Sequence, residues 1–211
     1  MDAAFFRDWM TAAAAVVETQ RDHLTQLDAA IGDADHGINM ARGFGAVTAA
    51  LEQKDTPTPG SVLTLAGSTL ISKVGGASGP LYGMALRSAG KALGGTSDAD
   101  LHALAGALEA ALAGVQKLGA ARKGEKTMVD ALAPAVSALA KALAEGAPAD
   151  GALSALAAAA QAGAQSTVSM QALKGRASYL GPRSVGHEDP GAASMALILG
   201  ALRDVAARRA T

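Results

Sequence analysis

The chain has 211 residues, of which half are hydrophobic and 18% are charged, so it can bury a real core and is not a disordered tail. Its 18 basic and 19 acidic residues leave a net charge of -1, which excludes a general attraction to nucleic acid, and the absence of cysteine excludes disulfides and thiolate metal sites. No uninterrupted apolar run is long enough to span a membrane and the first residues lack a signal-peptide pattern, so we expect a soluble, cytoplasmic protein.

The composition predicts an all-α fold. Alanine, the strongest helix former, makes up about a quarter of the chain, whereas β-branched and aromatic residues are sparse. Breaks and caps divide the chain into eight predicted helices, at residues 2–28, 36–53, 59–74, 79–94, 98–118, 128–145, 150–170 and 190–209. Because short connections join antiparallel neighbours, this pattern predicts an up-and-down bundle in one domain, 1–211.

Local signals mark several helix starts and one long loop. Ser97 with Asp100, and Thr127 with Asp130, have the spacing of capping boxes, and prolines 59, 80 and 190 stand where helices are expected to begin. The stretch 171–188 is 18 residues rich in Gly, Arg, Ser and Pro without helical periodicity. We predict a functional or mobile loop there.

Three carboxylates fall within eight residues between the first two predicted helices: Asp28, Asp33 and Asp35. Glycines 32 and 37 permit a tight turn, so the carboxylate oxygens can converge. Such groups repel one another unless a cation lies among them, and oxygen ligands favour magnesium, calcium or manganese. The alternative is that one of these aspartates only caps the next helix.

Two further loops are candidate phosphate sites. The glycine-rich segment 75–83 opens a predicted helix whose free amides can receive a phosphate, although it lacks the lysine of a Walker loop and can be a plain turn. In the segment 174–183, Arg176 can bind a phosphate with two hydrogen bonds, or the segment can be an exposed basic loop. The four histidines do not have zinc-site spacing.

Taken together, these motifs resemble the nucleotide-binding L subunits of dihydroxyacetone kinases over essentially the whole chain. The segments that carry the resemblance are Asp28 with 33–39, then 75–80, 126–130 and 175–181. The resemblance implies an antiparallel eight-helix barrel with the nucleotide, ADP or ATP, at one end. It also implies two magnesium ions held by Asp28, Asp33 and Asp35.

The resemblance further implies a set of nucleotide contacts. His36, Gly37, Ile38 and Asn39 match residues at the phosphates, Ala77 and Ser78 match the glycine-rich loop, Gly119 and Met128 match the nucleobase side, Arg176 matches a loop contact, and Asp189, Pro190 and Gly191 lie near the same pocket. His36, Asn39, Ser78 and loop amides are expected to orient the phosphates. No side chain is expected to act as a base, because metal and positioning suffice for phosphoryl transfer.

The chain has no room for a domain that binds dihydroxyacetone, so the resemblance implies a partner subunit that holds this acceptor. In the branch of the family that we favour for a separate subunit, bound ADP is rephosphorylated by a phosphohistidine partner of the phosphotransferase system; in the other branch, ATP exchanges. A different ketose acceptor, a non-catalytic nucleotide-binding regulator and a purely structural bundle are the alternatives. We expect no nucleic-acid or membrane partner and leave a homodimer open.

Overall fold

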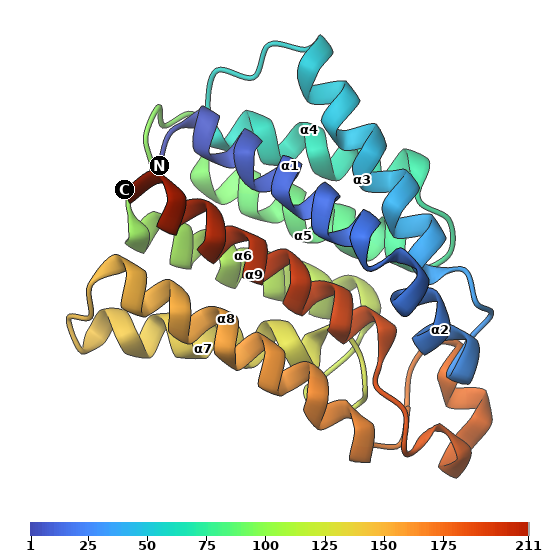
Figure 1. Ribbon diagram of the computed structural model, residues 1–211. Coiled ribbons are helices and arrows are strands. Elements are labelled where there is room, and N and C mark those ends of the chain that lie inside the picture. Colours follow the sequence, from blue (N-terminus) through green and yellow to red (C-terminus); the bar gives the residue numbers. More distant parts are fainter. Residues whose placement is uncertain (211) are drawn as a thin grey trace.

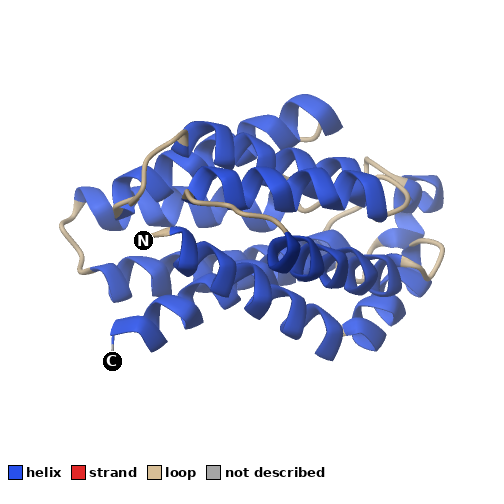
Figure 2. Ribbon diagram, turned by 90° about the horizontal axis from the view of Figure 1, so that it is seen from above, coloured by secondary structure: helices blue, strands red, loops and turns tan. Residues whose placement is uncertain are grey.

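The computed structural model describes residues 1–210, which are mostly helical and contain no β-strand (Figures 1 and 2). The α-helices are α1 (Ala3–Thr19), α2 (Arg21–Ile31), α3 (His36–Gln53), α4 (Pro59–Lys73), α5 (Ser78–Leu93), α6 (Leu101–Gly119), α7 (Val129–Ala144), α8 (Ala149–Ser166) and α9 (Pro190–Ala210). Two 3-10 segments, η1 (Thr167–Ser169) and η2 (Arg176–Ser184), precede α9. The predicted all-α class is confirmed.

Eight of the helices form a closed antiparallel ring. From α3 to α9 each helix packs against the next in the chain, and α1 packs against both α3 and α9 (Figure 1). At the closure, the indole N–H of Trp9 donates to the carbonyl oxygen of Ile198, 2.9 Å away, so a buried polar group on α1 is satisfied by α9. The predicted eight-helix barrel is confirmed.

Small residues bring neighbouring helices into close contact. A Cβ atom on Gly67 of α4 would lie 2.5 Å from the carbonyl oxygen of Gly83 of α5, and a Cβ on Gly83 would lie 2.6 Å from the carbonyl oxygen of Gly67. Since real Cβ atoms do not approach so closely, these backbones can pack at this distance only with glycine at both positions. The backbones of the two helices are therefore in direct contact at this point.

The predicted first helix, 2–28, is wrong as a single element. The chain bends at Gln20, and α2 leaves the ring to pack against α3, α9 and η2 at one end of the barrel (Figure 1). At this contact a Cβ on Gly37 would lie 2.0 Å from the carbonyl oxygen of Arg21, so a glycine on α3 lets α2 turn inward. The extra helix covers the end of the barrel that carries the candidate site.

The predicted helix starts and the predicted long loop are confirmed only in part. Thr58 and Ser61 form a capping box with Pro59 at the first turn of α4, so that start is confirmed. The predicted cap at Ser97 is wrong, because Asp100 itself caps α6 by accepting a hydrogen bond from the amide of Ala103. The predicted loop 171–188 contains η2, a short 3-10 helix that is interrupted at Gly181.

Among residues 1–210, α9 is the one helix long and apolar enough to cross a membrane by length and composition alone. Of the most apolar 18-residue stretch of this helix, 61% is buried inside the protein, and the helix packs against α1 and α8. The apolar character of α9 is therefore accounted for by the core of the barrel.

Candidate functional site

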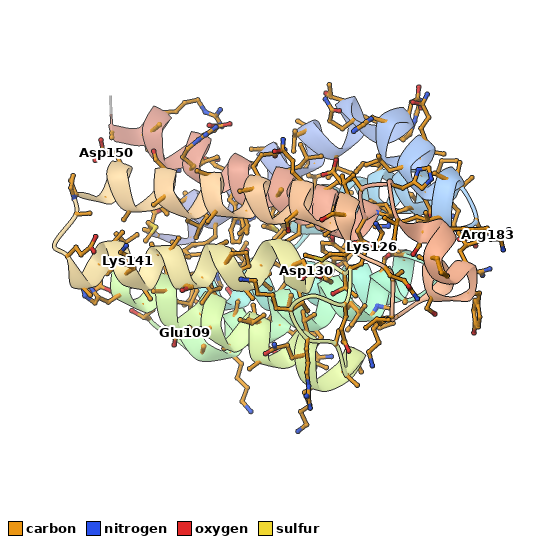
Figure 3. All side chains as sticks on the ribbon, turned by 90° about the horizontal axis from the view of Figure 1, so that it is seen from below. Glu109, Lys126, Asp130, Lys141, Asp150 and Arg183 are labelled. Carbon is orange, nitrogen blue, oxygen red and sulfur yellow. The ribbon has the colours of Figure 1, made fainter. Side chains whose placement is uncertain are left out.

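Four loops meet at one end of the barrel. Because the ring runs up and down, the connections after α2, α4, α6 and α8 all lie at the same end (Figure 1). They surround a cavity of about 490 Å³, a size typical of small-molecule sites. In Figure 3, Lys126 and Asp130 lie toward this end, whereas Lys141 and Asp150 lie at the opposite end.

The three predicted metal ligands do converge. Asp28 is on the last turn of α2, and Asp33 and Asp35 are in the turn before α3; each offers an oxygen, and these three oxygens lie within 4.8 Å of one another. The amides of Asp35 and His36 donate to Asp28 Oδ2, at 2.9 and 3.2 Å. Gly32 leaves room for this carboxylate, since a Cβ there would lie 2.0 Å from Asp28 Oδ1.

The acidic cluster has a shortage of positive charge. Three carboxylates at this separation repel one another, and among residues 1–210 the cationic side chain that forms an ion pair with the cluster is Arg176, 3.1 Å from Asp33. Both members of that pair are partly exposed, so the pair contributes little stability. Ala34 holds a left-handed backbone, φ 61°, between the two aspartates of the turn. The donor set fits a hard divalent cation.

The glycine-rich loop forms the wall beside the acids. Ala77 precedes α5 without a side-chain cap, and Ser78 is the first helical residue, so the first amides of α5 are open to a ligand. Both residues line the cavity. His36 lines it too, with Nδ1 3.2 Å from Ser78 Oγ, and burial lowers the pKa of this histidine despite the nearby Asp28 and Asp35. Its imidazole is therefore neutral at neutral pH.

Part of the cavity lining is apolar. Val115, Leu118 and Gly119 of α6 form this part together with Leu81 and Met128. This surface suits a flat, uncharged ring. It includes Gly119 and Met128, the two residues that were predicted to lie on the nucleobase side.

A buried lysine joins two of the loops. Lys126, in the α6–α7 connection, is 1% exposed, and its Nζ donates to the carbonyl oxygens of Thr167, at 2.6 Å, and of His187. These two carbonyls stand near the start and the end of residues 167–189, which we call the strap. In the same connection Asp130 accepts from the amides of Gly124 and Thr127. Lys126 thereby fixes the base of the strap.

The strap ends at a buried carboxyl group. Asp189 Oδ2 accepts from the amide of Ala192 in the first turn of α9, 2.7 Å away. Burial raises the pKa of Asp189 to about 7, although this hydrogen bond and Lys126 oppose the shift. Pro190 and Gly191 follow it along the cavity wall.

Twelve of the fifteen predicted site residues line the cavity: Asp28, Asp33, Asp35, His36, Ala77, Ser78, Gly119, Met128, Arg176, Asp189, Pro190 and Gly191. Gly37 instead packs against α2, and Ile38 is 52% exposed. Asn39 is buried, and its Oδ1 accepts from Arg42, 2.7 Å away. A role for these three at a phosphate stays a prediction.

Sequence reasoning gave no role to three polar residues at the cavity. Lys126 and Tyr82 line it, and Ser194 lies behind His36, 2.8 Å from Nε2. Lys126 was noticed only as part of a motif. Ser194 stands on an apolar helix far along the chain, where no local pattern marks it.

The chain is similar to known proteins over most of its length. A family model described as "DAK2 domain" matches residues 30–204. The chain is 43% identical over 194 residues to the "PEP-dependent dihydroxyacetone kinase 1, ADP-binding subunit DhaL" of Listeria innocua, covering 92% of each chain. It is 42% identical over 192 residues to the "PEP-dependent dihydroxyacetone kinase, ADP-binding subunit DhaL" of Escherichia coli, covering 91% of each.

Similarity extends to solved structures and to a larger kinase. The dihydroxyacetone kinase of C. freundii in its native form superposes with a TM-score of 0.74 at 28% identity, over 97% of this chain and 35% of that chain. Its complex with AMP-PNP and Mg²⁺ gives 0.72 and 30%, over 97% and 34%. The L-erythrulose 1-kinase of Mycolicibacterium smegmatis is 40% identical over 181 residues, which are 31% of its length. This chain thus spans about a third of those proteins.

Proposed function

Because the chain belongs to the DAK2 domain family, we propose that it is the nucleotide-binding subunit of a dihydroxyacetone kinase. The observation that carries the proposal is the acidic cluster beside a glycine-rich loop in one cavity, in a chain that matches ADP-binding subunits of such kinases over nine-tenths of their length. These relatives support the PEP-dependent form, in which bound ADP is rephosphorylated by a phosphohistidine-bearing partner before the phosphate passes to dihydroxyacetone.

In this proposal Asp28, Asp33 and Asp35 hold two magnesium ions. Their oxygens are close enough to share cations, and their mutual repulsion is relieved when cations bind. When bound there, magnesium would neutralise phosphate charge in phosphoryl transfer. The hydrogen bonds from the amides of Asp35 and His36 hold the Asp28 carboxylate in place beforehand.

The remaining cavity residues bind and orient the nucleotide. The amides at the start of α5 face the phosphates, and the apolar wall with Leu118 and Met128 accepts the base. Arg176, on the strap, lies next to Asp33, where its charge can balance a phosphate and its loop can exclude water. No side chain of this chain is needed as a base.

The cavity end is also the proposed docking face for the acceptor-holding subunit. Among residues 1–210, the large hydrophobic side chains that are exposed all belong to elements at this end: Ile38, Ile71, Leu118, Val168, Leu173, Tyr179 and Val185. Tyr179, at the tip of the strap, is 88% exposed. Since the acceptor has to reach a phosphate held in the cavity, its carrier has to cover this mouth, and an apolar rim suits such a contact.

A second candidate is an ATP-using kinase with exchangeable nucleotide and dihydroxyacetone or another ketose as acceptor. It is favoured by the likeness to a kinase solved with AMP-PNP and Mg²⁺ and by the likeness to an L-erythrulose 1-kinase. Mass spectrometry of the nucleotide released from freshly purified, denatured protein separates the two. Retained ADP supports the first candidate, and a nucleotide-free or rapidly exchanging site supports the second.

Asp33→Asn tests the kinase proposal itself. We expect it to abolish magnesium-dependent ADP binding and phosphoryl transfer in the assembled system, because it removes a charged ligand while keeping the side-chain shape. Asp22→Asn, an exposed carboxylate on the same helix as Asp28, is the matched control. Full transfer by Asp33→Asn contradicts the metal assignment. If the unmodified protein binds ADP in a magnesium-dependent way but transfers no phosphate in the assembled system, it is a non-catalytic regulator.

We place the protein in the cytoplasm, where nucleotide-dependent kinases find their phosphate donors, and take 1–211 as one domain. Light scattering of the free chain tests whether it forms a homodimer.

A further inference from the structure

Arg42 joins α3 to the end of α4, directly before the glycine-rich loop. Its Nε donates to the carbonyl oxygen of Lys73 in the last turn of α4, 3.2 Å away, and its Nη2 donates to Asn39 Oδ1, 2.7 Å away. The last carbonyl groups of a helix have no partner within the helix, and the helix dipole favours a cation beside them. One guanidinium group therefore binds both the end of α4 and a side chain of α3.

An apolar contact next to Arg42 holds the same two helices together. A Cβ on Gly43 of α3 would lie 2.1 Å from Val74 Cγ2, so the lack of a side chain at residue 43 lets α3 pack closely on the residue that follows α4. Val74 is buried, and Gly75 and Gly76 after it line the cavity. The guanidinium group of Arg42 is therefore held where two packed helices meet the glycine-rich loop.

The bond to Arg42 fixes the direction of the Asn39 amide group. A guanidinium group only donates, so the oxygen of Asn39 faces Arg42, and the nitrogen with its two hydrogens is turned away from it. Asn39 is 8% exposed, and among residues 1–210 its Nδ2 has no hydrogen-bond partner. A Cβ on Gly75 would lie 3.8 Å from this nitrogen. Two N–H donors therefore lie beside the glycine-rich loop.

We propose that Arg42 is a positioning residue that holds the Asn39 amide group in one orientation, with its N–H donors available to a phosphate. Arg42 does not line the cavity, so it acts through Asn39. Asn39 lies one turn after Asp35 and donates its main-chain amide to the carbonyl oxygen of Asp35, 2.9 Å away. The oriented donors thus lie between the acidic cluster and the glycine-rich loop. The inference rests on the proposed function, in which this is where the phosphates of the nucleotide bind.

The orientation of Asn39 can be measured directly. Asn39 is the single asparagine of the chain, so asparagine labelled with ¹⁵N at Nδ2 gives one pair of side-chain signals. In the nucleotide-free, full-length protein we expect an order parameter of about 0.8 for this group, falling below about 0.6 in Arg42→Met, because the amide oxygen loses its donor. Arg87→Met is the matched control, since Arg87 is an exposed arginine of α5 that does not line the cavity. It should leave the signals unchanged.

Binding measurements test the consequence for the phosphates. Isothermal titration should show magnesium-dependent ADP binding weakened by about 5-fold or more in Arg42→Met and by about 10-fold or more in Asn39→Ala, which removes the donors themselves. Adenosine has no phosphate, so its binding should change by less than about 2-fold in either variant. Because Arg42 acts through Asn39, the double variant should bind ADP within about 2-fold of Asn39→Ala.

Three results overturn the proposal. They are an Asn39 amide group that is equally rigid with and without Arg42, losses that multiply in the double variant, and an equal loss of adenosine binding, which would indicate a general change of the fold. Arg42→Gln, which is too short to reach both acceptors, answers the question if Arg42→Met does not fold. The relaxation measurement needs no nucleotide, so failure of the unmodified protein to bind ADP contradicts the proposed function alone, whereas normal ADP binding by Arg42→Met contradicts this inference alone.

Discussion

Gly32→Ala places a methyl group where the Asp28 carboxylate lies. The added Cβ would be 2.0 Å from Asp28 Oδ1 and 2.8 Å from its Cγ, and because real contacts exceed 3.0 Å, the oxygen has to move by about 1 Å or more. That movement disrupts the hydrogen bonds to Asp28 Oδ2 from the amides of Asp35 and His36. Bonds to a charged group are worth about 1.5–3 kcal/mol each, so loss of at least one of them should weaken magnesium–ADP binding by about 1.5–3 kcal/mol or more, which is at least roughly 10-fold.

Isothermal titration of ADP at saturating magnesium measures this loss, and circular dichroism confirms that the variant keeps its helices. Gly45→Ala is the control, since a Cβ at this exposed position in α3 meets nothing within 4 Å. It should bind as the unmodified protein does and gain about 0.5–1 kcal/mol of stability from the better helix former. Normal magnesium-dependent binding by folded Gly32→Ala would refute the role assigned to Asp28.

Three further changes probe the strap and its base. Lys126→Met removes both hydrogen bonds to the strap 167–189, so we expect faster amide exchange there and a loss of about 1–3 kcal/mol in urea unfolding. Burial raises the folded-state pKa of Asp189 to about 7, above its ordinary value of 3.8. The free energy of unfolding should therefore fall as pH rises from about 4 to 7, by up to about 1.4 kcal/mol per pH unit. Asp189→Asn should remove that fall. Arg176→Gln should leave urea unfolding unchanged, because its pair with Asp33 is exposed, but should speed ADP release in stopped-flow traces.

Each of these has an outcome that contradicts it. Unchanged exchange in Lys126→Met would mean that other contacts fix the strap, and Lys123→Met, an exposed lysine in the same connection, is its control. A stability profile of Asp189→Asn that matches the unmodified protein from pH 4 to 7 would mean that the carboxyl group is charged in the folded state. Unaltered ADP release in Arg176→Gln would exclude a closing role for the strap.

The helices could be predicted because their signals are local. High alanine content and the proline at the start of α4 act within a few residues of one another, and each gives a confirmed element. The bend at Gln20 could not be predicted, since Thr19, Gln20 and Arg21 contain no glycine or proline. The bend brings α2 against Gly37 of α3, a contact made only when the barrel is folded.

The same division holds within the cavity. The cluster of Asp28, Asp33 and Asp35 could be predicted because these residues are close together in the sequence. Three carboxylates in one short turn repel one another unless a cation lies among them. The contact between His36 and Ser194 joins residues 158 positions apart, so no spacing in the sequence announces it. Lys126 reads as one more surface lysine, because only the folded chain shows that two carbonyl groups surround its ammonium group.

The antiparallel ring explains why short, distant motifs can form one site. With each helix reversing direction, every second loop returns to the same end, so the turn before α3, the loop before α5, the connection before α7 and the strap before α9 meet without a long insertion. Lys126 ties the last two together at their base, whereas the tip of the strap, between Gly175 and Gly181, carries the most exposed aromatic side chain of the described chain, Tyr179. The fixed base of the strap holds Asp189 and the start of α9 beside the cavity, whereas its exposed tip leaves Arg176 and Tyr179 accessible to a nucleotide or a partner. One part of the strap is therefore held in place by Lys126, and another part is accessible to ligands.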